Sequence, residues 1–257
     1  MKRAVLACVL VWSAAGAGHA WASAAEGDKA RAARIRTELA VGYLEQGQLA
    51  VAQQELQQAL QADPQFAQAH HAMALLQMRL GDVARARESF ERALALSPRD
   101  SDILHNHGWL LCQQGEHARA TQAFAQSLAN PLYTQRARTL MAQGVCQLQA
   151  GDAEAAQASL SRALALDPTH PLTRYHLAQA LLRRGDLGGA RLQTQSLNES
   201  VFANAQTLWL GIRVERRARN AEAAARLAQR LEREHPQSQE FAAWQRGADD
   251  EIGRAHV

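Results

Sequence analysis

Small and apolar residues recur along the chain with a period of 34 residues. Pro64 and Pro98 lie one period apart, and Pro168 follows Pro98 after two periods and two further residues. In each period an alanine or glycine falls near the eighth and twentieth positions, a glycine near the fifteenth, and a phenylalanine or leucine near the twenty-fourth. A fixed period of this length predicts helix–turn–helix repeats that stack on one another.

Each residue type has a physical role in such a helix pair. Small residues at the eighth and twentieth positions let the two helices approach closely. The glycine ends the first helix in a left-handed turn that other residues adopt only at a cost. The proline stops the second helix because it lacks an N–H and clashes with the preceding turn. The predicted repeats begin near Ala33, Ala67, Ser101, Ala137, Pro171 and Ala205.

The period and these positions resemble tetratricopeptide repeats (TPRs). The sequence therefore predicts an all-α fold, a TPR superhelical solenoid of about six helix-turn-helix pairs over residues 33–238. The composition agrees, because aromatic residues make up only 5% and the chain is rich in the helix formers Ala, Leu, Gln and Arg. In such a solenoid the first helices of successive pairs line a concave groove where partners dock.

The first residues have the order of a secretory signal peptide. Lys2 and Arg3 precede an apolar run over 4–17, and small residues follow over 20–25. We expect residues 1–24 to be removed by cleavage after Ala22 or Ala24, with cleavage after Ala20 and an uncleaved anchor as the alternatives. Cys8 has the local surroundings of a lipidation site, but only seven residues precede it. The sequence therefore favours export without lipidation.

Residues 239–257 are predicted to form a C-terminal tail. The last seven residues, 251–257, have no amphipathic pattern and match the translation of a common sequencing-adapter end. We expect these seven to be an artefact.

The charge and the motifs argue against several functions. The net charge is +3, and without Lys2 and Arg3 it is +1, too balanced for nucleic-acid binding. There is no glycine-rich phosphate loop, and the histidines lack the spacing of a zinc site. We therefore expect no enzyme activity, no cofactor and no metal.

Three segments resemble the type IV pilus biogenesis/stability (PilW/PilF) family. They are Leu104–Gly115, the connection over 130–138 and Leu208–Arg213. The resemblance implies a periplasmic protein associated with the outer membrane that binds the pilus secretin subunit and promotes its localisation and multimerisation. Other pilus assembly proteins are further partners that it implies. Family members are usually lipoproteins, and the position of Cys8 departs from that pattern. The alternatives are a general periplasmic TPR scaffold for another envelope system and, more weakly, an enzyme with a TPR fold.

The groove of the first three repeats is the candidate binding surface. TPR geometry predicts that its walls carry apolar and aromatic side chains, although several of them could serve only in packing. The candidates are Val41, Leu44, His71, Leu75, Met78, His105 and Trp109.

Five further residues are assigned structural roles. Gly108 and Gly144 fall at the eighth position of their repeats, and Asn106 is expected to bond to nearby groups rather than to a partner. Cys112 and Cys146 lie one period apart on adjacent first helices. In an oxidising compartment they form either a disulfide or two buried thiols.

Overall fold

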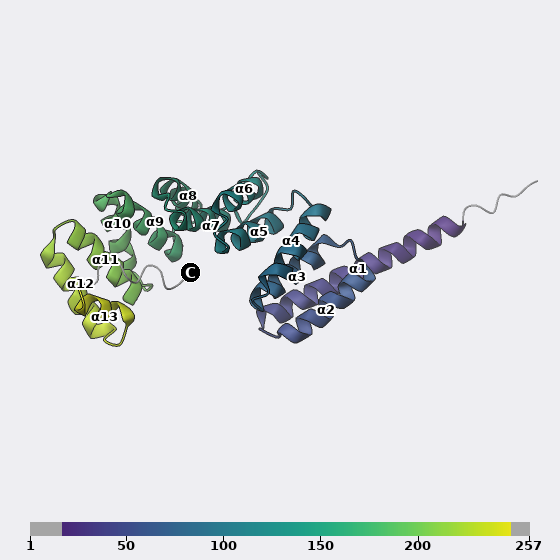
Figure 1. Cartoon of the computed structure of the whole chain (residues 1–257), viewed down its shortest axis with the longest axis horizontal. Helices are drawn as coiled ribbons and strands as arrows, with labels where there is room; N and C mark the ends of the chain where they lie inside the picture. Colours follow the sequence, from purple (N-terminus) through teal and green to yellow (C-terminus); the bar gives the residue numbers. More distant parts are fainter. Residues whose placement is uncertain (1–16, 248–257) are drawn as a thin grey trace, which may run out of the picture. The chain divides into compact units, whose positions relative to one another are not determined.

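The computed structural model describes the chain over residues 17–247, with side chains from residue 27 onward. Between these bounds the chain forms thirteen α-helices and no strand, as predicted (Figure 1). The helices are α1 (Ala17–Glu45), α2 (Leu49–Ala62), α3 (Ala67–Arg79), α4 (Val83–Leu96), α5 (Ser101–Gln113), α6 (His117–Leu128), α7 (Arg136–Gln149), α8 (Ala153–Leu166), α9 (Pro171–Arg184), α10 (Leu187–Asn198), α11 (Ala205–Arg217), α12 (Ala221–Glu234) and α13 (Gln239–Gln245).

The first twelve helices form the six predicted pairs. Helices α3, α5, α9 and α11 begin at the predicted repeat starts, and α7 begins one residue before the predicted Ala137. The solenoid of helix-turn-helix repeats is thus confirmed. Helix α1 begins well before the predicted Ala33, at Ala17.

The contacts divide the chain after Pro98 into two units. In the first, α1 packs on α2 and α3, and α3 packs on α4, around a core of Ala40, Leu44, Ala52, Leu56, Ala72 and Leu76. In the second, each first helix packs on its own second helix, and each second helix packs on the next pair. The largest core of this unit lies between α7, α8, α9, α10 and α11.

Five glycines make the left-handed turns inside the repeats. Gly47, Gly81, Gly115, Gly151 and Gly185 have φ of 74°, 75°, 76°, 83° and 80°. The sixth repeat has Arg219 at the equivalent position, 34 residues after Gly185, and its φ is 56°. A side chain with a Cβ pays a conformational penalty there, because the Cβ approaches the following carbonyl oxygen.

Replacing Arg219 by glycine is expected to stabilise the second unit by about 0.5–1 kcal/mol. The substitution relieves the left-handed penalty of about 1–2 kcal/mol, and the greater freedom of glycine in the unfolded chain offsets part of that gain. Urea unfolding followed by circular dichroism measures the change. The control is Arg226→Gly inside α12, which should destabilise by about 1 kcal/mol. A loss of stability in both variants would contradict the interpretation.

Gly108 and Gly144 lie where helices of one pair cross. A Cβ on Gly108 would lie 3.0 Å from Cδ1 of Phe124, and a Cβ on Gly144 would lie 2.5 Å from Cγ of Leu160. Phe124 and Leu160 are fully buried. The helix pairs α5–α6 and α7–α8 can therefore approach this closely only with glycine at these positions.

Helix α13 differs from the predicted tail. It begins after Ser238, whose side chain accepts a hydrogen bond from the Phe241 N–H (3.1 Å), and it packs on α11 and α12. Phe241 and Ala243 are buried against Leu208 and Ile212. The assignment of 239–245 to a tail was therefore wrong: the last repeat of a solenoid exposes an apolar face, and α13 covers it.

Cys8 and the seven residues expected to be an artefact lie outside the described residues, so export without lipidation stays a prediction. Cleavage after Ala22 or Ala24 also stays a prediction. Among the described helices, none has the combination of length and apolar character that a membrane span requires.

Candidate protein-binding groove

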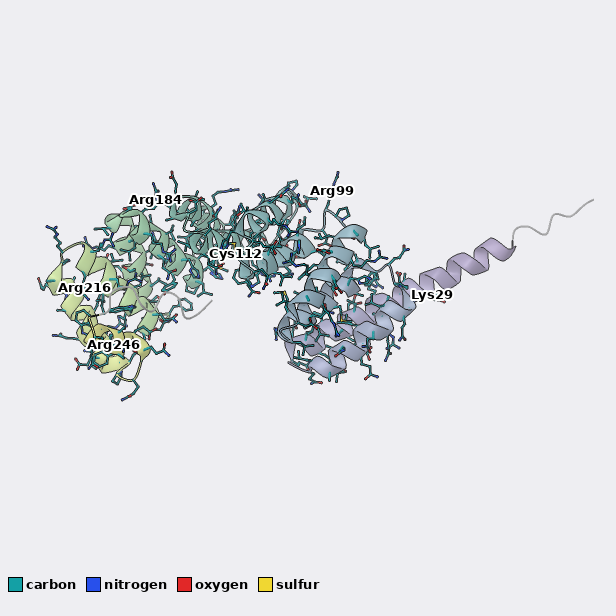
Figure 2. All side chains as sticks on the ribbon, in the orientation of Figure 1. Lys29, Arg99, Cys112, Arg184, Arg216 and Arg246 are labelled. Carbon is teal, nitrogen blue, oxygen red and sulfur yellow. A yellow bond between two sulfur atoms is a disulfide. The ribbon has the colours of Figure 1, made fainter. Side chains whose placement is uncertain are left out.

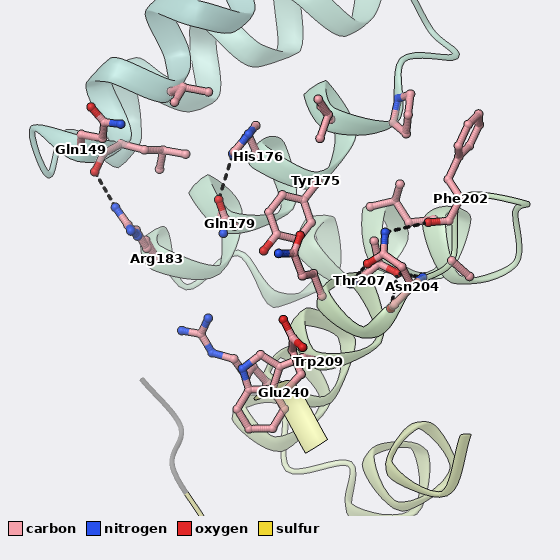
Figure 3. A pocket seen from close by; sticks show the side chains of 18 of the residues that line it. Gln149, Tyr175, His176, Gln179, Arg183, Phe202, Asn204, Thr207, Trp209 and Glu240 are labelled. Carbon is pink, nitrogen blue, oxygen red and sulfur yellow. Dashed lines mark hydrogen bonds between the residues drawn. The ribbon is translucent and has the colours of Figure 1, made fainter. Parts of the chain in front are cut away.

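The second unit has a groove along its first helices. Its volume is about 990 Å³, and its walls are α7, α9 and α11, the loop before α11, and one residue each of α10 and α13 (Figure 3). Among the residues that line it are Leu148, Gln149, Leu172, Tyr175, His176, Gln179, Arg183, Val201, Phe202, Trp209, Arg213 and Glu240.

One end of the groove is apolar. Leu172 at the start of α9 is 56% exposed, and Phe202 in the loop before α11 is 50% exposed. Asn204 holds this loop with a capping box, in which its side chain accepts from the Thr207 N–H and its own N–H donates to Thr207 Oγ1. The Phe202 side chain is therefore presented by a loop whose junction with α11 is fixed.

The middle of the groove carries neutral polar groups. Burial raises the pKa of Tyr175, and the Glu240 carboxylate raises it further while Arg213 lowers it. Burial lowers the pKa of His176, whose Nδ1 lies 3.0 Å from Oε1 of Gln179. Both side chains are thus uncharged at neutral pH, and Figure 3 shows them beside Gln179 on the same helix.

The other end of the groove is basic. Arg183 near the end of α9 is exposed, and its Nη1 donates to the carbonyl oxygen of Leu148 at the end of α7. Arg213 lies on the opposite wall, on α11. The one carboxylate among the lining residues is that of Glu240, which is 7% exposed.

The residues that line this groove include those at the repeat positions of His105 and Trp109, but they belong to repeats four to six. Trp109 is followed at the same repeat position by Val145, Gln179 and Arg213, all of which line the groove. His105 is followed at its own position by Tyr175 and Trp209, which also line it. The concave positions could therefore have been extended to repeats four to six by the same register.

The candidates in the first unit divide into two groups. Val41 is 38% exposed, and His71, Leu75 and Met78 are partly exposed on α3, which packs on α1. Their contact with a partner stays a prediction. Leu44 is only 6% exposed and belongs to the core, so it offers little surface to a partner, and its place on a groove wall also stays a prediction.

His105 is also buried. It is 3% exposed, its Nδ1 lies 2.9 Å from Oγ1 of Thr139, and its ring packs 5.9 Å from that of Phe124. One period earlier, the ring of His71 lies 5.9 Å from that of Phe90. His105 therefore packs between helices, and its place on a groove wall stays a prediction.

Two residues near His105 on α5, Asn106 and Trp109, are more exposed to solvent than His105 is. Trp109 is partly exposed beside the core of α5, α6 and α7. Asn106 is also partly exposed, and its Oδ1 lies 3.5 Å from Nη2 of Arg138 on α7. This contact with the neighbouring first helix fits the structural role expected for Asn106.

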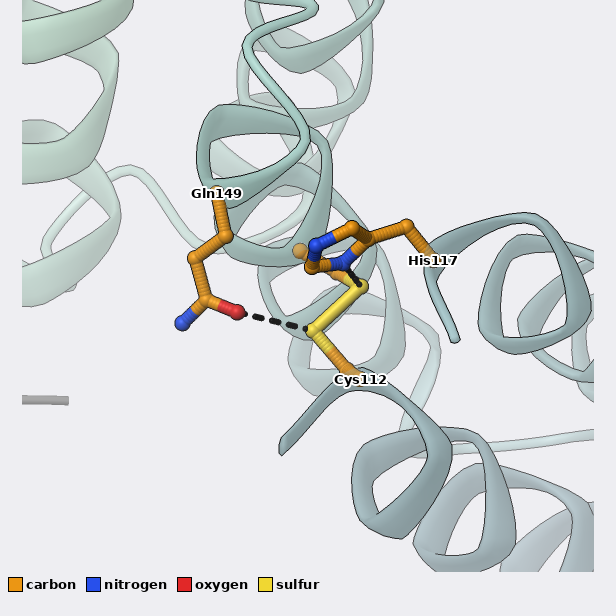
Figure 4. The surroundings of a disulfide bond; sticks show 4 residues. Cys112, His117 and Gln149 are labelled. Atoms are coloured by element: carbon orange, nitrogen blue, oxygen red, sulfur yellow. Dashed lines mark hydrogen bonds between the residues drawn. A yellow bond between two sulfur atoms is a disulfide. The ribbon is translucent and has the colours of Figure 1, made fainter. Parts of the chain in front are cut away.

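Cys112 and Cys146 are bonded to each other in the structure, with Cα atoms 5.7 Å apart (Figure 4). His117 Nδ1 lies 3.5 Å from the Cys146 sulfur, and Gln149 Oε1 lies 3.1 Å from the Cys112 sulfur. Donor atoms of Cys112, His117 and Cys146 all lie within 4.8 Å of one another, which was not anticipated from the sequence. A metal would need thiolates, which a disulfide does not supply.

Comparison with known proteins agrees with this architecture. Models of the tetratricopeptide repeat match residues 37–101, 71–137 and 147–206, together more than half of the chain. The chain therefore belongs to the tetratricopeptide repeat family. No curated protein matches the sequence.

Two solved structures of TPR proteins resemble this chain over most of its length. Pseudomonas aeruginosa PilF is 27% identical with a TM-score of 0.76, and the match covers 86% of this chain and 99% of PilF. PilW, described as a widely conserved type IV pilus biogenesis factor, is 29% identical with a TM-score of 0.77, and the match covers 83% of this chain and 98% of PilW. The resemblance to the PilW/PilF proteins is thus confirmed. YrrB, a TPR protein with an unusual peptide-binding site, is 16% identical with a TM-score of 0.63, and shares the fold.

Proposed function

We propose that this chain is a periplasmic, outer-membrane-associated TPR scaffold that binds the type IV pilus secretin subunit and promotes its localisation and multimerisation. The observation that carries the proposal is the match to PilF and PilW over nearly their whole length, 99% and 98% of those chains. A TPR solenoid with a groove on its first helices is suited to holding a segment of another protein.

The chemistry of the described surface supports a binding role. Exposed apolar side chains at one end and cationic and amide groups at the other line one groove, an arrangement that holds a peptide by shape and charge. Export through the predicted signal peptide would place the chain in the compartment where secretin subunits assemble.

Deletion of the gene in its own host tests the proposal. Secretin multimers, resistant to detergent on gels, are expected to fall strongly, and twitching motility should be lost. Re-expression of the full chain should restore both. The mature chain should also retain the secretin subunit from a detergent extract of the envelope. A deletion strain that still assembles secretin multimers and pili would overturn the proposal and favour a general periplasmic scaffold.

A further inference from the structure

We propose that the groove of α7, α9 and α11 binds a short, extended, acidic segment of a partner protein, with one apolar side chain at its start or end and carboxylates at the opposite end. This inference rests on the proposed function only in requiring that the chain binds protein. It names the chemistry of the bound segment and the residues that select it.

The charge of the groove favours acidic groups. The ionised lining residues are Arg183 and Arg213 against the single carboxylate of Glu240, because His176 is neutral. Arg183 is exposed and uses Nη1 for the Leu148 carbonyl, which anchors the guanidinium at the edge of the groove. A guanidinium presents several N–H donors in one plane, which suits a carboxylate.

A second donor lies beside Arg183. Figure 3 shows Gln149 next to it at the end of α7. The Gln149 Nε2 is buried, and it has no hydrogen-bond partner among the described residues. An unpartnered buried donor costs free energy, so an acceptor brought by a ligand stabilises this position. A carboxylate bound to Arg183 would bring an acceptor to this side of the groove, beside the Gln149 amide.

The apolar end of the groove has a matching surface. Leu172, Val201 and Phe202 are 56%, 93% and 50% exposed and line the same groove. Each exposes apolar surface to water in the free protein. Covering that surface with one aromatic or aliphatic side chain of a ligand is therefore favourable. The bound segment therefore has two different ends, one apolar and one acidic.

The length of α9 sets the spacing between these ends. Leu172 and Arg183 are eleven residues apart on one helix, which is about 16 Å at 1.5 Å per residue. An extended chain covers that distance in about five residues. A segment of about five residues in extended form therefore reaches from the apolar end of the groove to Arg183.

Fluorescence anisotropy with synthetic peptides tests this. The probe is fluorescein-labelled Phe-Ser-Gly-Ser-Ser-Asp-Asp, whose phenylalanine and first aspartate are separated by the inferred spacing. Three comparison probes replace the aspartates by lysine, replace the phenylalanine by alanine, or shorten the spacer to one residue. The acidic probe should bind the whole chain at least ten-fold more tightly than each comparison probe, and its affinity should fall with salt.

Two pairs of variants assign the effect to the groove. Arg183→Gln should weaken binding of the acidic probe about ten-fold, because one charge-assisted contact is lost. Arg184→Gln is its control, since Arg184 is also exposed on α9 but bonds Gln157 on α8 (Figure 2). Phe202→Ser should weaken binding by a similar factor, and Leu166→Ser, at a 55% exposed position of α8, should not. Circular dichroism confirms that each variant is folded.

Equal binding of the aspartate and lysine probes, or equal effects of Arg183→Gln and Arg184→Gln, would overturn the inference. So would a concentration-dependent dimer that Phe202→Ser abolishes, because the occupant would then be a second copy. The result of the peptide-binding experiment can be told apart from the result of the gene deletion that tests the proposed function. Selective peptide binding in a chain whose deletion leaves secretin assembly intact would sustain the inference and overturn the function.

Discussion

Replacing Cys112 and Cys146 together by alanine is expected to lower the free energy of unfolding of the second unit by about 3–4 kcal/mol. The crosslink spans 34 residues of chain, so it removes much conformational freedom from the unfolded state. The two residues are 2% and 0% exposed, and their Cα separation of 5.7 Å is normal for a disulfide. Burial also protects the bond from external thiols, so it is expected to be structural.

Urea unfolding followed by circular dichroism measures this effect. The oxidised wild-type chain should unfold at the highest urea concentration, and addition of reductant should lower its midpoint toward that of the alanine variant. The midpoint of the variant itself should not respond to reductant, which controls for other effects of the reagent. A mass spectrum of the mature chain, taken without reductant, that showed both thiols free would contradict the prediction.

Gly144→Ala is expected to destabilise the second unit by about 2–3 kcal/mol, although alanine is normally the better helix former. The added Cβ would lie 2.5 Å from Cγ and 2.9 Å from Cδ2 of Leu160. Leu160 is fully buried in the core formed by α7 to α11, so it cannot turn into solvent to make room. The helices must therefore separate, which loosens the packing around them.

A matched substitution separates steric conflict from helix propensity. Gly42 lies inside α1, and a Cβ there would meet nothing within 4 Å. Gly42→Ala is therefore expected to stabilise the first unit by about 0.5–1 kcal/mol. The double variant Gly144→Ala/Leu160→Ala should lose less stability than the two single variants combined, because the new methyl group partly fills the space left by the leucine. Additive losses would show that the two side chains do not conflict.

The repeat architecture could be read from the sequence because its signals are local. A glycine such as Gly115 ends a helix through its own left-handed turn, and a proline such as Pro98 prevents the helix before it from continuing. Each of these effects depends on a few neighbouring residues and recurs with a fixed period. The helix starts at Ala67, Ser101, Pro171 and Ala205 were therefore predictable.

The location of the groove could not be read in this way. Equivalent positions such as His105 and Tyr175 have the same place on their helices, yet His105 packs against Thr139 and Phe124 whereas Tyr175 lines the groove. The difference comes from the side chains that neighbouring helices bring, which the period does not specify. The loop that presents Phe202 likewise has no counterpart in the ideal repeat.

The sequence by itself determined that the chain is a stack of six helix pairs, because turn and crossing residues act over short distances. The repeat register also predicted which face of each first helix points toward a groove, and in α7, α9 and α11 residues at those positions line the groove. Only the tertiary structure decided which of these faces remain open, how α13 covers the last core, and that Leu44 and His105 are buried. Burial depends on packing between segments distant in sequence, and a periodic pattern does not encode it.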